Sequence, residues 1–256
     1  MPGEYEQNVR FFDSTAPRYD ELIGQTPEAV LAREVFQNLV TQHVPPGETL
    51  LDFGCGTGLD AAHYAGRGYR VLAYDNSPGM IEQLERRGAD PHVTPLCFDY
   101  SEFDRRIEDW PRPSAAAANF AVLNHLRDPG AWFDVMARRL ASPAWIVLSV
   151  LNPTHWTHVR TLRWWRNLLS SEPLPVRSPE SCTIYLHSLP SLLRAARGFR
   201  LVGRANAGSL VRYDAGGQTT WYGNPSSLNR ARRILWRTPV RALLGHFVFL
   251  VLKRDS

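Results

Sequence analysis

The sequence is poor in lysine and in cysteine. Lys253 is the one lysine among its 29 basic residues. A phosphate-binding G-x-x-x-x-G-K-[ST] loop requires a lysine, so this class of nucleotide site is excluded. Cysteine occurs three times, at Cys55, Cys97 and Cys182. Three scattered cysteines provide neither a disulfide framework nor a zinc site, so we expect a reducing compartment.

Long apolar segments are also missing. The longest apolar run, FVFLVL at residues 247–252, is far shorter than a membrane span requires. Residues 1–20 contain no apolar core of the signal-peptide type. We therefore expect a soluble, cytoplasmic protein. With 44% apolar and 21% charged residues in a chain of 256, the composition is that of an ordinary globular protein.

Acidic residues are scarce in the C-terminal part of the chain. Residues 1–150 contain 13 arginines and 21 acidic residues, a net charge of −8. Residues 151–256 contain 15 arginines and Lys253 against 4 acidic residues, a net charge of +12. This split indicates either an interaction surface in the C-terminal part or two faces of one globule that attract each other. The sequence leaves both interpretations open.

Short apolar runs alternate with segments of helical periodicity. We expect strands at 49–53, 69–75, 93–99, 115–124 and 145–152, and helices at 26–44, 59–67, 77–88 and 129–141. Two later runs, 199–208 and 246–254, resemble further strands. Apolar strands that alternate with helices indicate a parallel sheet covered on both faces. The predicted fold is a doubly wound, mostly parallel, seven-stranded α/β sheet of the Rossmann-like type, with an antiparallel edge strand.

Three glycines, Gly54, Gly56 and Gly58, follow the first predicted strand and its terminal Asp52. Glycine is costly to order, so the cluster predicts that backbone passes close to a ligand. The carboxyl ends of parallel strands are where α/β proteins bind ligands. The order D-x-G-x-G-x-G differs from the dinucleotide-binding G-x-G-x-x-G. Asp52 would repel a pyrophosphate, but it suits a ligand with a cationic amino group.

Two more acidic residues end the next two strands. Asp75 lies 17 residues after Gly58, where a carboxylate can bind the hydroxyls of a ribose. Asp99 ends the third strand, where it can accept a hydrogen bond from an exocyclic amine while Tyr100 flanks a ring. An amino acid, a ribose and an adenine together describe S-adenosylmethionine.

Four segments carry a family resemblance. LLDFGCGTG, VLAYDNSPGMI, FDYSEF and NFAVLNHL resemble, in this order and spacing, the successive motifs of class I S-adenosylmethionine-dependent methyltransferases. FFDSTAPRYDEL at 11–22 is similar to the Tyr-Asp signature of the quinone- and small-molecule-modifying branch, which is methyltransferase type 11-like. The resemblance covers residues 10–152 and implies S-adenosylmethionine as cofactor and S-adenosylhomocysteine as product, without a metal. One departure, ASPAW at 141–145 in place of a Pro-Gly-Gly turn, affects a turn rather than the cofactor site.

The resemblance also implies which residues bind the cofactor. Around the methionine part it places Asp52, Gly54, Cys55 and Gly56, with Gly58 at the start of the following helix. The residues expected at the ribose and the adenine are Asp75, Asn76, Met80, Asp99 and Tyr100. Asn119 and Phe120 are expected near the sulfonium, and Tyr19 is expected to close the site. Cys55 is interpreted as a small packing residue rather than a nucleophile, because its neighbours are those that cofactor binding requires.

His125 and Asn124 directly follow the fourth strand and are the candidate catalytic residues. His125 can act as a general base for an oxygen or nitrogen acceptor, or it can be a structural histidine that binds loop backbone. The residues expected in the acceptor pocket are Tyr185, His187, His155 and Trp156. No acidic or histidine pair has the spacing of a metal site.

The organisation that follows is one domain in two halves. Residues 1–152 form the cofactor-binding half, with a helical cap at 1–45, and residues 153–256 the C-terminal half, with insertions at 153–198 and 209–245. Insertions beside the carboxyl ends of the strands build a pocket wall or a helical lid. The first insertion is rich in tryptophan and arginine, so a peripheral membrane contact is the alternative to a lid.

The leading hypothesis is a methyltransferase, monomer or homodimer, that acts on a small aromatic or lipophilic molecule at oxygen, nitrogen, sulfur or carbon. A nucleic-acid methyltransferase is disfavoured, because NFAV replaces the Asn/Asp-Pro-Pro-Tyr tetrad expected after strand four. A non-catalytic S-adenosylmethionine-binding partner protein stays open. The hypothesis of an NAD-dependent dehydrogenase holds only if NAD raises the thermal stability of the protein and S-adenosylmethionine does not.

Overall fold

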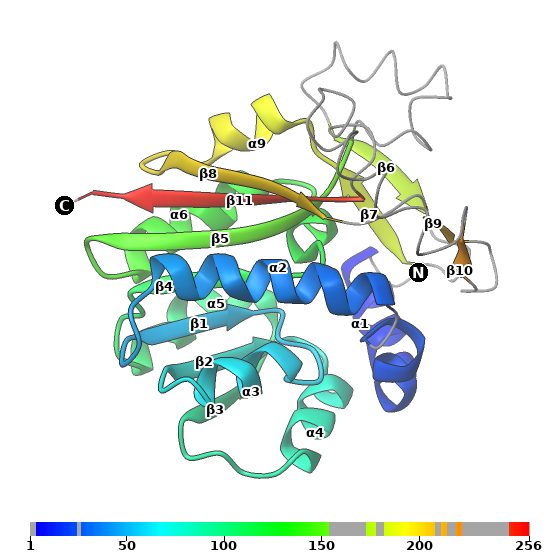
Figure 1. The fold of residues 1–256 in the computed structure, drawn as a ribbon, viewed down its shortest axis with the longest axis horizontal. Helices are drawn as coiled ribbons and strands as arrows, with labels where there is room; N and C mark the ends of the chain where they lie inside the picture. Colours follow the sequence, from blue (N-terminus) through cyan, green and yellow to red (C-terminus); the bar gives the residue numbers. More distant parts are fainter. Residues whose placement is uncertain are drawn as a thin grey trace, which may run out of the picture.

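The computed structural model describes residues 4–24, 27–153, 173–177, 182–207, 211–213, 219–221 and 246–255 (Figure 1). Its main sheet consists of β1 (Thr49–Phe53), β2 (Arg70–Asp75), β3 (Val93–Cys97), β4 (Ala115–Ala118), β5 (Ala144–Leu151), β8 (Arg200–Ala207) and β11 (Phe247–Arg254). The longer helices are α1 (Glu4–Thr15), α2 (Pro27–His43), α3 (Leu59–Ala65), α4 (Pro78–Arg86), α6 (Pro129–Arg139) and α9 (Leu189–Ala195).

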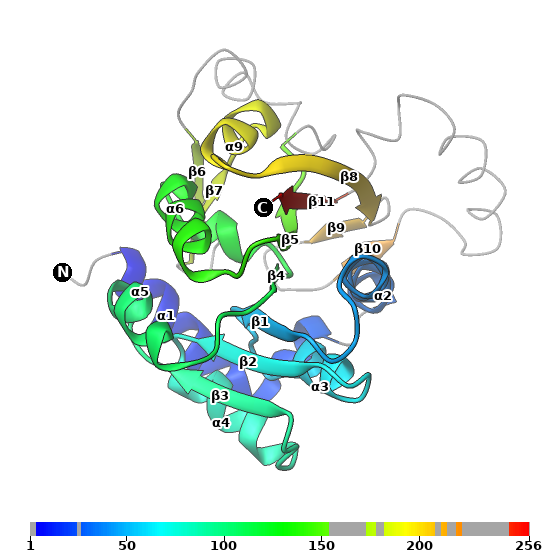
Figure 2. The same cartoon turned by 90° about the vertical axis from the view of Figure 1, so that its left-hand side faces the viewer.

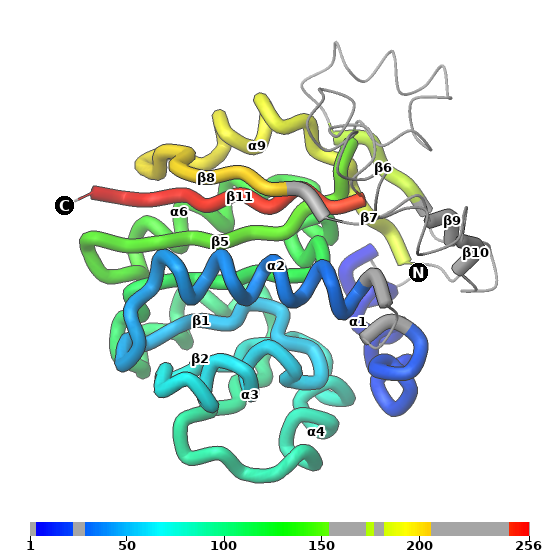
Figure 3. Tube along the Cα trace, in the orientation of Figure 1, coloured from blue at the N-terminus to red at the C-terminus, as the bar shows by residue number. Residues whose placement is uncertain are grey.

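The strand order is β3-β2-β1-β4-β5-β11-β8. The pairs from β3 to β5 are all parallel, and β11 is antiparallel to both of its neighbours, β5 and β8. Figure 3 shows β11 running between these two strands, so β8 forms the edge of the sheet. The chain direction along the sheet reverses between β1 and β4, which makes the carboxyl end of β1 the switch point. The prediction of a mostly parallel, doubly wound seven-stranded sheet is confirmed.

The sheet has a hydrophobic core on each face. Leu50 of β1 belongs to a cluster with Phe36 of α2 and Tyr64 of α3, whereas the next residue, Leu51, belongs to a cluster with Trp132 of α6. This alternation follows from the pleat, which points successive side chains to opposite faces. Figure 2 shows α2 on one side of the sheet and α6 and α9 on the other.

The fourth strand is shorter than the apolar run 115–124 suggests. β4 ends at Ala118, because Phe120 and Ala121 adopt positive φ angles of 49° and 62°. The chain then forms a short 3-10 helix, η5 (Val122–His125), where the sequence predicted strand. Ser77 caps α4 by accepting a hydrogen bond from the amide of Met80 at 3.2 Å.

The C-terminal half contributes additional elements that periodicity did not reveal. A two-stranded antiparallel hairpin pairs β6 (Leu174–Arg177) with β7 (Thr183–Leu186), and a second pairs β9 (Val211–Tyr213) with β10 (Thr219–Trp221). Most of the insertion at 209–245 and residues 154–172 lie outside the described residues. The described residues also contain short helical segments: η1 (Ala16–Arg18), η2 (Asp20–Gly24), η3 (Tyr100–Glu102), α5 (Phe103–Arg106) and η4 (Ile107–Asp109). In the ranges that the structure describes, no helix combines the length and apolarity that crossing a bilayer requires.

Replacing Phe36 by Ala should destabilise the folded protein by about 3–5 kcal/mol, the usual cost of deleting a buried aromatic ring. Phe36 is fully buried, and its ring centroid lies 6.0 Å from that of Phe249 in β11. Unfolding in urea measures the change. Val30→Ala on the same helix is the control, because Val30 is 50% exposed and its loss should stay within about 0.5 kcal/mol. Equal effects of the two changes would contradict the packing described.

Candidate active site

The loop between β1 and α3 has the conformation that its glycines suggested. Gly54, Gly56 and Gly58 have φ angles of +74°, +54° and +82°. The amides of Gly54 and Cys55 both donate to the carbonyl of Tyr74 in β2, at 2.8 and 2.9 Å. A Cβ on Gly54 would lie 2.6 Å from Cγ2 of Val122, so the loop has no room for a side chain there. Glycine is therefore required both by the backbone and by the packing.

Asp75 connects this loop to the start of α4. Its Oδ2 accepts a hydrogen bond from the amide of Gly56 at 2.9 Å, and its Oδ1 accepts one from the amide of Ser77 at 2.9 Å. Burial raises the pKa of Asp75 to about 6, against the effect of these two amides, which lower it. Asp75 lines the pocket. The carboxylate is thus held in place by backbone and stays largely ionised at neutral pH.

Three carboxylates gather near the glycine loop. Burial raises the pKa of Asp52 well above its ordinary value, and the charges of Asp60 and Asp75 raise it further, while Arg33 lowers it. Asp52 Oδ2 is buried without a hydrogen-bond partner among the described residues. Arg33 is the one guanidinium in this cluster of named charges, so the negative groups outnumber the positive ones and the cluster favours a cationic ligand.

Asp60 in the first turn of α3 is held by side chains from α2 and from the loop after β4. Its carboxylate accepts hydrogen bonds from Gln37 at 2.7 Å and from Asn119 at 2.9 Å, and it lies 3.4 Å from Nε of Arg33. The Arg33 guanidinium also lies over the ring of Phe120, 4.6 Å from its centroid. Asp60, Arg33 and Asn119 all line the pocket. The first turn of α3 therefore joins the helical cap to the loop after β4.

Helix α1 closes the pocket from outside the sheet, beyond the carboxyl ends of β1 and β2 (Figure 1). Asp13 accepts hydrogen bonds from Oγ of Ser77 at 2.6 Å and from the amide of Gly79 at 2.9 Å, where α4 begins. The hydroxyl of Tyr5 accepts from Nδ2 of Asn76 at 3.0 Å and from the amide of Tyr100 at 2.9 Å. The helix is thus fixed to two loops of the sheet.

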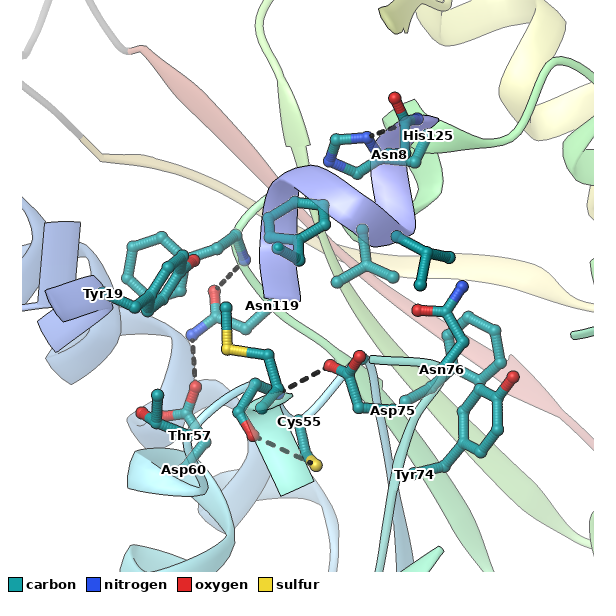
Figure 4. A pocket seen from close by; sticks show the side chains of 18 of the residues that line it. Asn8, Tyr19, Cys55, Thr57, Asp60, Tyr74, Asp75, Asn76, Asn119 and His125 are labelled. Atoms are coloured by element: carbon teal, nitrogen blue, oxygen red, sulfur yellow. Dashed lines mark hydrogen bonds between the residues drawn. The ribbon is translucent and has the colours of Figure 1, made fainter. Parts of the chain in front are cut away.

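The Tyr-Asp segment is fixed to the glycine loop. Asp20 accepts a hydrogen bond from Oγ1 of Thr57 at 2.6 Å and pairs with Arg87, which also donates to the carbonyl of Thr57. The neighbouring Tyr19 lines the pocket. Figure 4 shows Tyr19 and Asp60 on one side of the pocket, Asp75 and Asn76 on the other, and His125 beside Asn8 at the far end.

The pocket lies between the glycine loop, β2, helix α1 and the loop after β4. Its polar groups gather around the glycine loop and β2. Apolar side chains line the part between α1 and the loop after β4, and they comprise Val9, Phe12, Phe120, Val122 and Leu126.

His125 lines the pocket, whereas Asn124 does not. Burial lowers the pKa of His125 to about 4, so its imidazole is neutral at pH 7. Asn124 is fully buried; its Nδ2 donates to the carbonyl of Tyr185 at 2.7 Å and its Oδ1 accepts from the amide of Leu151 at 3.0 Å. Both polar atoms of the Asn124 side chain therefore bind backbone of β7 and β5, and the side chain does not face the pocket.

The structure places the other expected residues as follows. The lining of the pocket includes Tyr19, Gly54, Cys55, Gly56, Asp75, Asn76, Met80, Tyr100, Asn119 and Phe120; the residues that do not line it are Asp52, Gly58, Asp99, Tyr185 and His187. Asp99 is exposed and caps η3 by accepting from the amide of Ser101 at 2.8 Å. His187 binds the carbonyl of Leu126 at 2.9 Å, and Tyr185 donates to Glu4. His155 and Trp156 lie outside the described residues.

Burial raises the pKa of the Cys55 thiol well above its ordinary value. The thiol is therefore protonated at neutral pH and a poor nucleophile, which agrees with a packing role. Within the ranges described, no group of three or more His, Cys, Asp or Glu side chains is arranged to hold a metal ion.

The sequence analysis missed several pocket residues, among them Asp60, Arg33 and Asn8. Arg33 had a visible signal, since it interrupts the apolar face of the helix predicted at 26–44. A charged residue on the buried face of a helix requires a partner, and that partner is Asp60. Asn8 and Asp60 had no such signal, because their partners lie far away in sequence.

The sequence model of the methyltransferase domain family matches residues 26–202. The chain belongs to this family, which confirms the class of protein that the motifs predicted.

Curated relatives match over shorter segments. Malonyl-[acyl-carrier protein] O-methyltransferase of Serratia marcescens is 43% identical over 91 residues, covering 34% of this chain and 31% of that protein. Ubiquinone biosynthesis O-methyltransferase of Xylella fastidiosa is 28% identical over 116 residues, covering 45% of this chain and 47% of that protein. The match with the chain therefore spans less than half of the length of these two relatives.

Solved structures of similar fold match over the whole chain. A 1,6-didemethyltoxoflavin-N1-methyltransferase of Burkholderia thailandensis, with its substrate and S-adenosylhomocysteine bound, has a TM-score of 0.59 and 15% identity, covering 100% of this chain and 92% of that one. The [4+2]-cyclase SpnF has a TM-score of 0.65 and 17% identity, covering 100% and 98%. At this identity the likeness establishes the fold.

Replacing Gly54 by Ala should destabilise the protein by more than Gly68→Ala does. Both glycines have positive φ, +74° and +83°, so both changes introduce backbone strain of about 1–2 kcal/mol. At Gly68 nothing lies within 4 Å of the added Cβ, whereas at Gly54 it meets Val122. We expect an additional loss of about 1–3 kcal/mol at Gly54, measured by urea unfolding. The double variant Gly54→Ala/Val122→Ala should recover part of it, and equal losses at the two glycines would refute the close approach.

Proposed function

We propose that this chain binds S-adenosylmethionine in the pocket at the carboxyl ends of β1, β2 and β4, and transfers its methyl group to a small, largely apolar acceptor. The observation that carries the proposal is the ionised, backbone-held Asp75 beside a glycine loop, with more carboxylates than guanidinium groups around it. Family membership supports the same reaction class.

The residues present fit this cofactor end by end. Asp75 would accept the two hydroxyls of the ribose, since both of its oxygens are already aligned by backbone amides. The carboxylate of Asp60 suits the ammonium of the methionine end, and Asp52, whose Oδ2 is buried without a partner among the described residues, lies in the same cluster. Arg33 supplies a guanidinium for the carboxylate of the same ligand.

The bound cofactor supplies a methyl group that is already activated by the positive charge of its sulfonium. The protein then has to align the acceptor with that methyl group and keep water out. Orientation alone can lower a barrier by several kcal/mol. Helix α1 serves both purposes, because Val9 and Phe12 line the pocket while Asp13 fixes the helix to α4.

A small aromatic or lipophilic acceptor suits the remaining space. Apolar side chains from α1 and from the loop after β4 face each other there, Phe12 and Phe120 among them. Aromatic and aliphatic walls of this kind favour flat, uncharged molecules. Relatives named for quinone biosynthesis and a structural neighbour that methylates a toxoflavin precursor support the same chemical class.

Two alternative functions make different predictions. A nucleic-acid acceptor, which the basic C-terminal part suggests, requires affinity for random DNA or RNA that falls steeply with salt. A non-catalytic cofactor-binding partner would bind the cofactor without ever converting it. The similar fold of a [4+2]-cyclase illustrates that this architecture serves other reactions. A monomer or homodimer, a peripheral membrane contact through 153–198 and a cytoplasmic location stay predictions.

Titration calorimetry with S-adenosylhomocysteine tests the proposal. We expect binding to the wild-type chain, no heat with NAD, and a loss of about 100-fold in affinity for Asp75→Ala, since two hydrogen bonds to a charged group would be removed. Glu82→Ala on the exposed face of α4, where Glu82 pairs with Arg86, is the control and should bind normally. Absence of heat with S-adenosylhomocysteine, or density for it elsewhere in a crystal, would reject the site.

The affinity for S-adenosylhomocysteine should fall as the pH decreases below about 6. Ribose hydroxyls donate to the ionised carboxylate, and a pKa of Asp75 of about 6 means that protonation competes with binding below this value. The expected decrease is roughly tenfold between pH 7 and pH 5. Asp75→Asn should bind more weakly and lose the dependence attributable to Asp75, whereas Asp52→Asn should retain it. A wild-type affinity that is constant over this range would contradict the assignment.

A further inference from the structure

The side chain of Asn8 is fixed by the backbone of Thr183. Its Oδ1 accepts a hydrogen bond from the amide of Thr183 at 2.9 Å, and its Nδ2 donates to the carbonyl of the same residue at 3.0 Å. Asn8 is buried, with 7% of its surface exposed. A reversed side chain amide would place two donors and two acceptors against each other. The two hydrogen bonds therefore identify which end of this amide is nitrogen.

The nitrogen of Asn8 also faces the ring of His125. Nδ2 lies 3.3 Å from Nδ1 of His125. An amide nitrogen has two hydrogens and no lone pair to offer, and one of its hydrogens already points at Thr183. The contact is therefore favourable when Nδ1 is the acceptor. In a neutral imidazole with an unprotonated Nδ1, the proton is on Nε2.

A thiol also approaches the same ring nitrogen. Sγ of Cys182 lies 3.6 Å from Nδ1 of His125. In a Cys-His-Asn relay the cysteine and the asparagine bind opposite nitrogens of the ring, so that the asparagine orients the imidazole while it removes the thiol proton. Here both residues contact Nδ1, so the arrangement does not activate Cys182 as a nucleophile.

The surroundings of His125 favour its neutral form. The ring of Phe12 meets it edge to face, with centroids 5.2 Å apart. Burial lowers the pKa of His125 to about 4, a hydrogen bond with the backbone of Thr183 opposes this, and no charged side chain among the described residues contributes. Protonation of Nδ1 would set its N–H against the donor of Asn8. Cys182 is the titratable side chain that contacts this ring.

We infer that Asn8 is a positioning residue that holds His125 as the Nε2–H tautomer, so that His125 offers the acceptor a hydrogen bond and does not remove its proton. This inference rests on the proposed methyl transfer for its chemical consequence. The matching acceptor is nucleophilic without a base, such as a phenolate, a carboxylate or an uncharged nitrogen. It also bears an oxygen or nitrogen lone pair that Nε2–H can reach.

Nitrogen NMR of the unliganded protein tests the tautomer. Long-range proton–nitrogen spectra of a sample with ¹⁵N-labelled histidine distinguish protonated from unprotonated ring nitrogens, and the signals that disappear in His125→Gln belong to His125. We expect a protonated Nε2 and an unprotonated Nδ1 from pH 5 to pH 8. A proton on Nδ1, or a cationic ring at pH 6, would overturn the inference.

Asn8→Asp tests the role of Asn8. The carboxylate keeps the acceptor for the amide of Thr183 but replaces the donor that faces Nδ1 by an acceptor. We expect the proton to move to Nδ1 and the pKa of His125 to rise by at least two units. Glu4→Gln, which alters another anchor of α1 that does not touch His125, should change neither. If the tautomer and the pKa of His125 are unchanged in Asn8→Asp, Asn8 does not position the ring.

The outcome does not depend on either substitution folding well or on cofactor binding. If Asn8→Asp is unstable, Asn8→Ala removes the same donor without a new charge, and the preference of the proton for Nε2 of His125 should decrease. The wild-type spectrum decides the tautomer by itself. Calorimetry with S-adenosylhomocysteine tests the proposed function separately. The tautomer inference and the proposed function can therefore be rejected independently of each other.

Discussion

The carboxylate of Asp75 joins the two loops that form the floor of the pocket. One oxygen binds the amide of Gly56 in the glycine loop, and the other binds the amide of Ser77 at the start of α4. Because each oxygen is fixed by backbone, the carboxylate has a defined direction before any ligand arrives, which reduces the cost of binding. Burial raises the pKa of this carboxyl group to about 6, although the two amides that fix it act in the opposite direction.

Helix α1 connects the two ends of the pocket. Asp13 binds the start of α4 near the expected ribose, whereas Asn8, less than two turns earlier, binds Thr183 in β7 and faces His125. The polar anchors on this helix thus leave Val9 and Phe12 to line the space between them. A single helix therefore lines the pocket from the start of α4 to His125.

The sequence predicted the sheet and the glycine loop because both depend on local patterns: alternating apolar runs, and a strand that ends in Asp52 before three glycines. It failed where a contact joins distant residues. The hydrogen bonds between Asn8 and Thr183 span 175 positions, and no periodicity records them. The predicted strand at 115–124 was too long because Phe120 and Ala121, beyond Ala118, take positive φ, a conformation that side chains other than glycine rarely adopt and that no apolar pattern indicates.

His125 illustrates why geometry constrains the reaction more than residue type does. A histidine after the fourth strand invites the role of general base, and an imidazole with a pKa near 7 would serve well. With a pKa of about 4, proton removal by this ring is less favourable by roughly 4 kcal/mol than for such an imidazole, a loss that alignment of the acceptor would have to offset. A neutral ring whose Nδ1 is capped by Asn8 instead provides a directed donor at no such cost. On this inference, the matching acceptor is one that needs to be held rather than deprotonated.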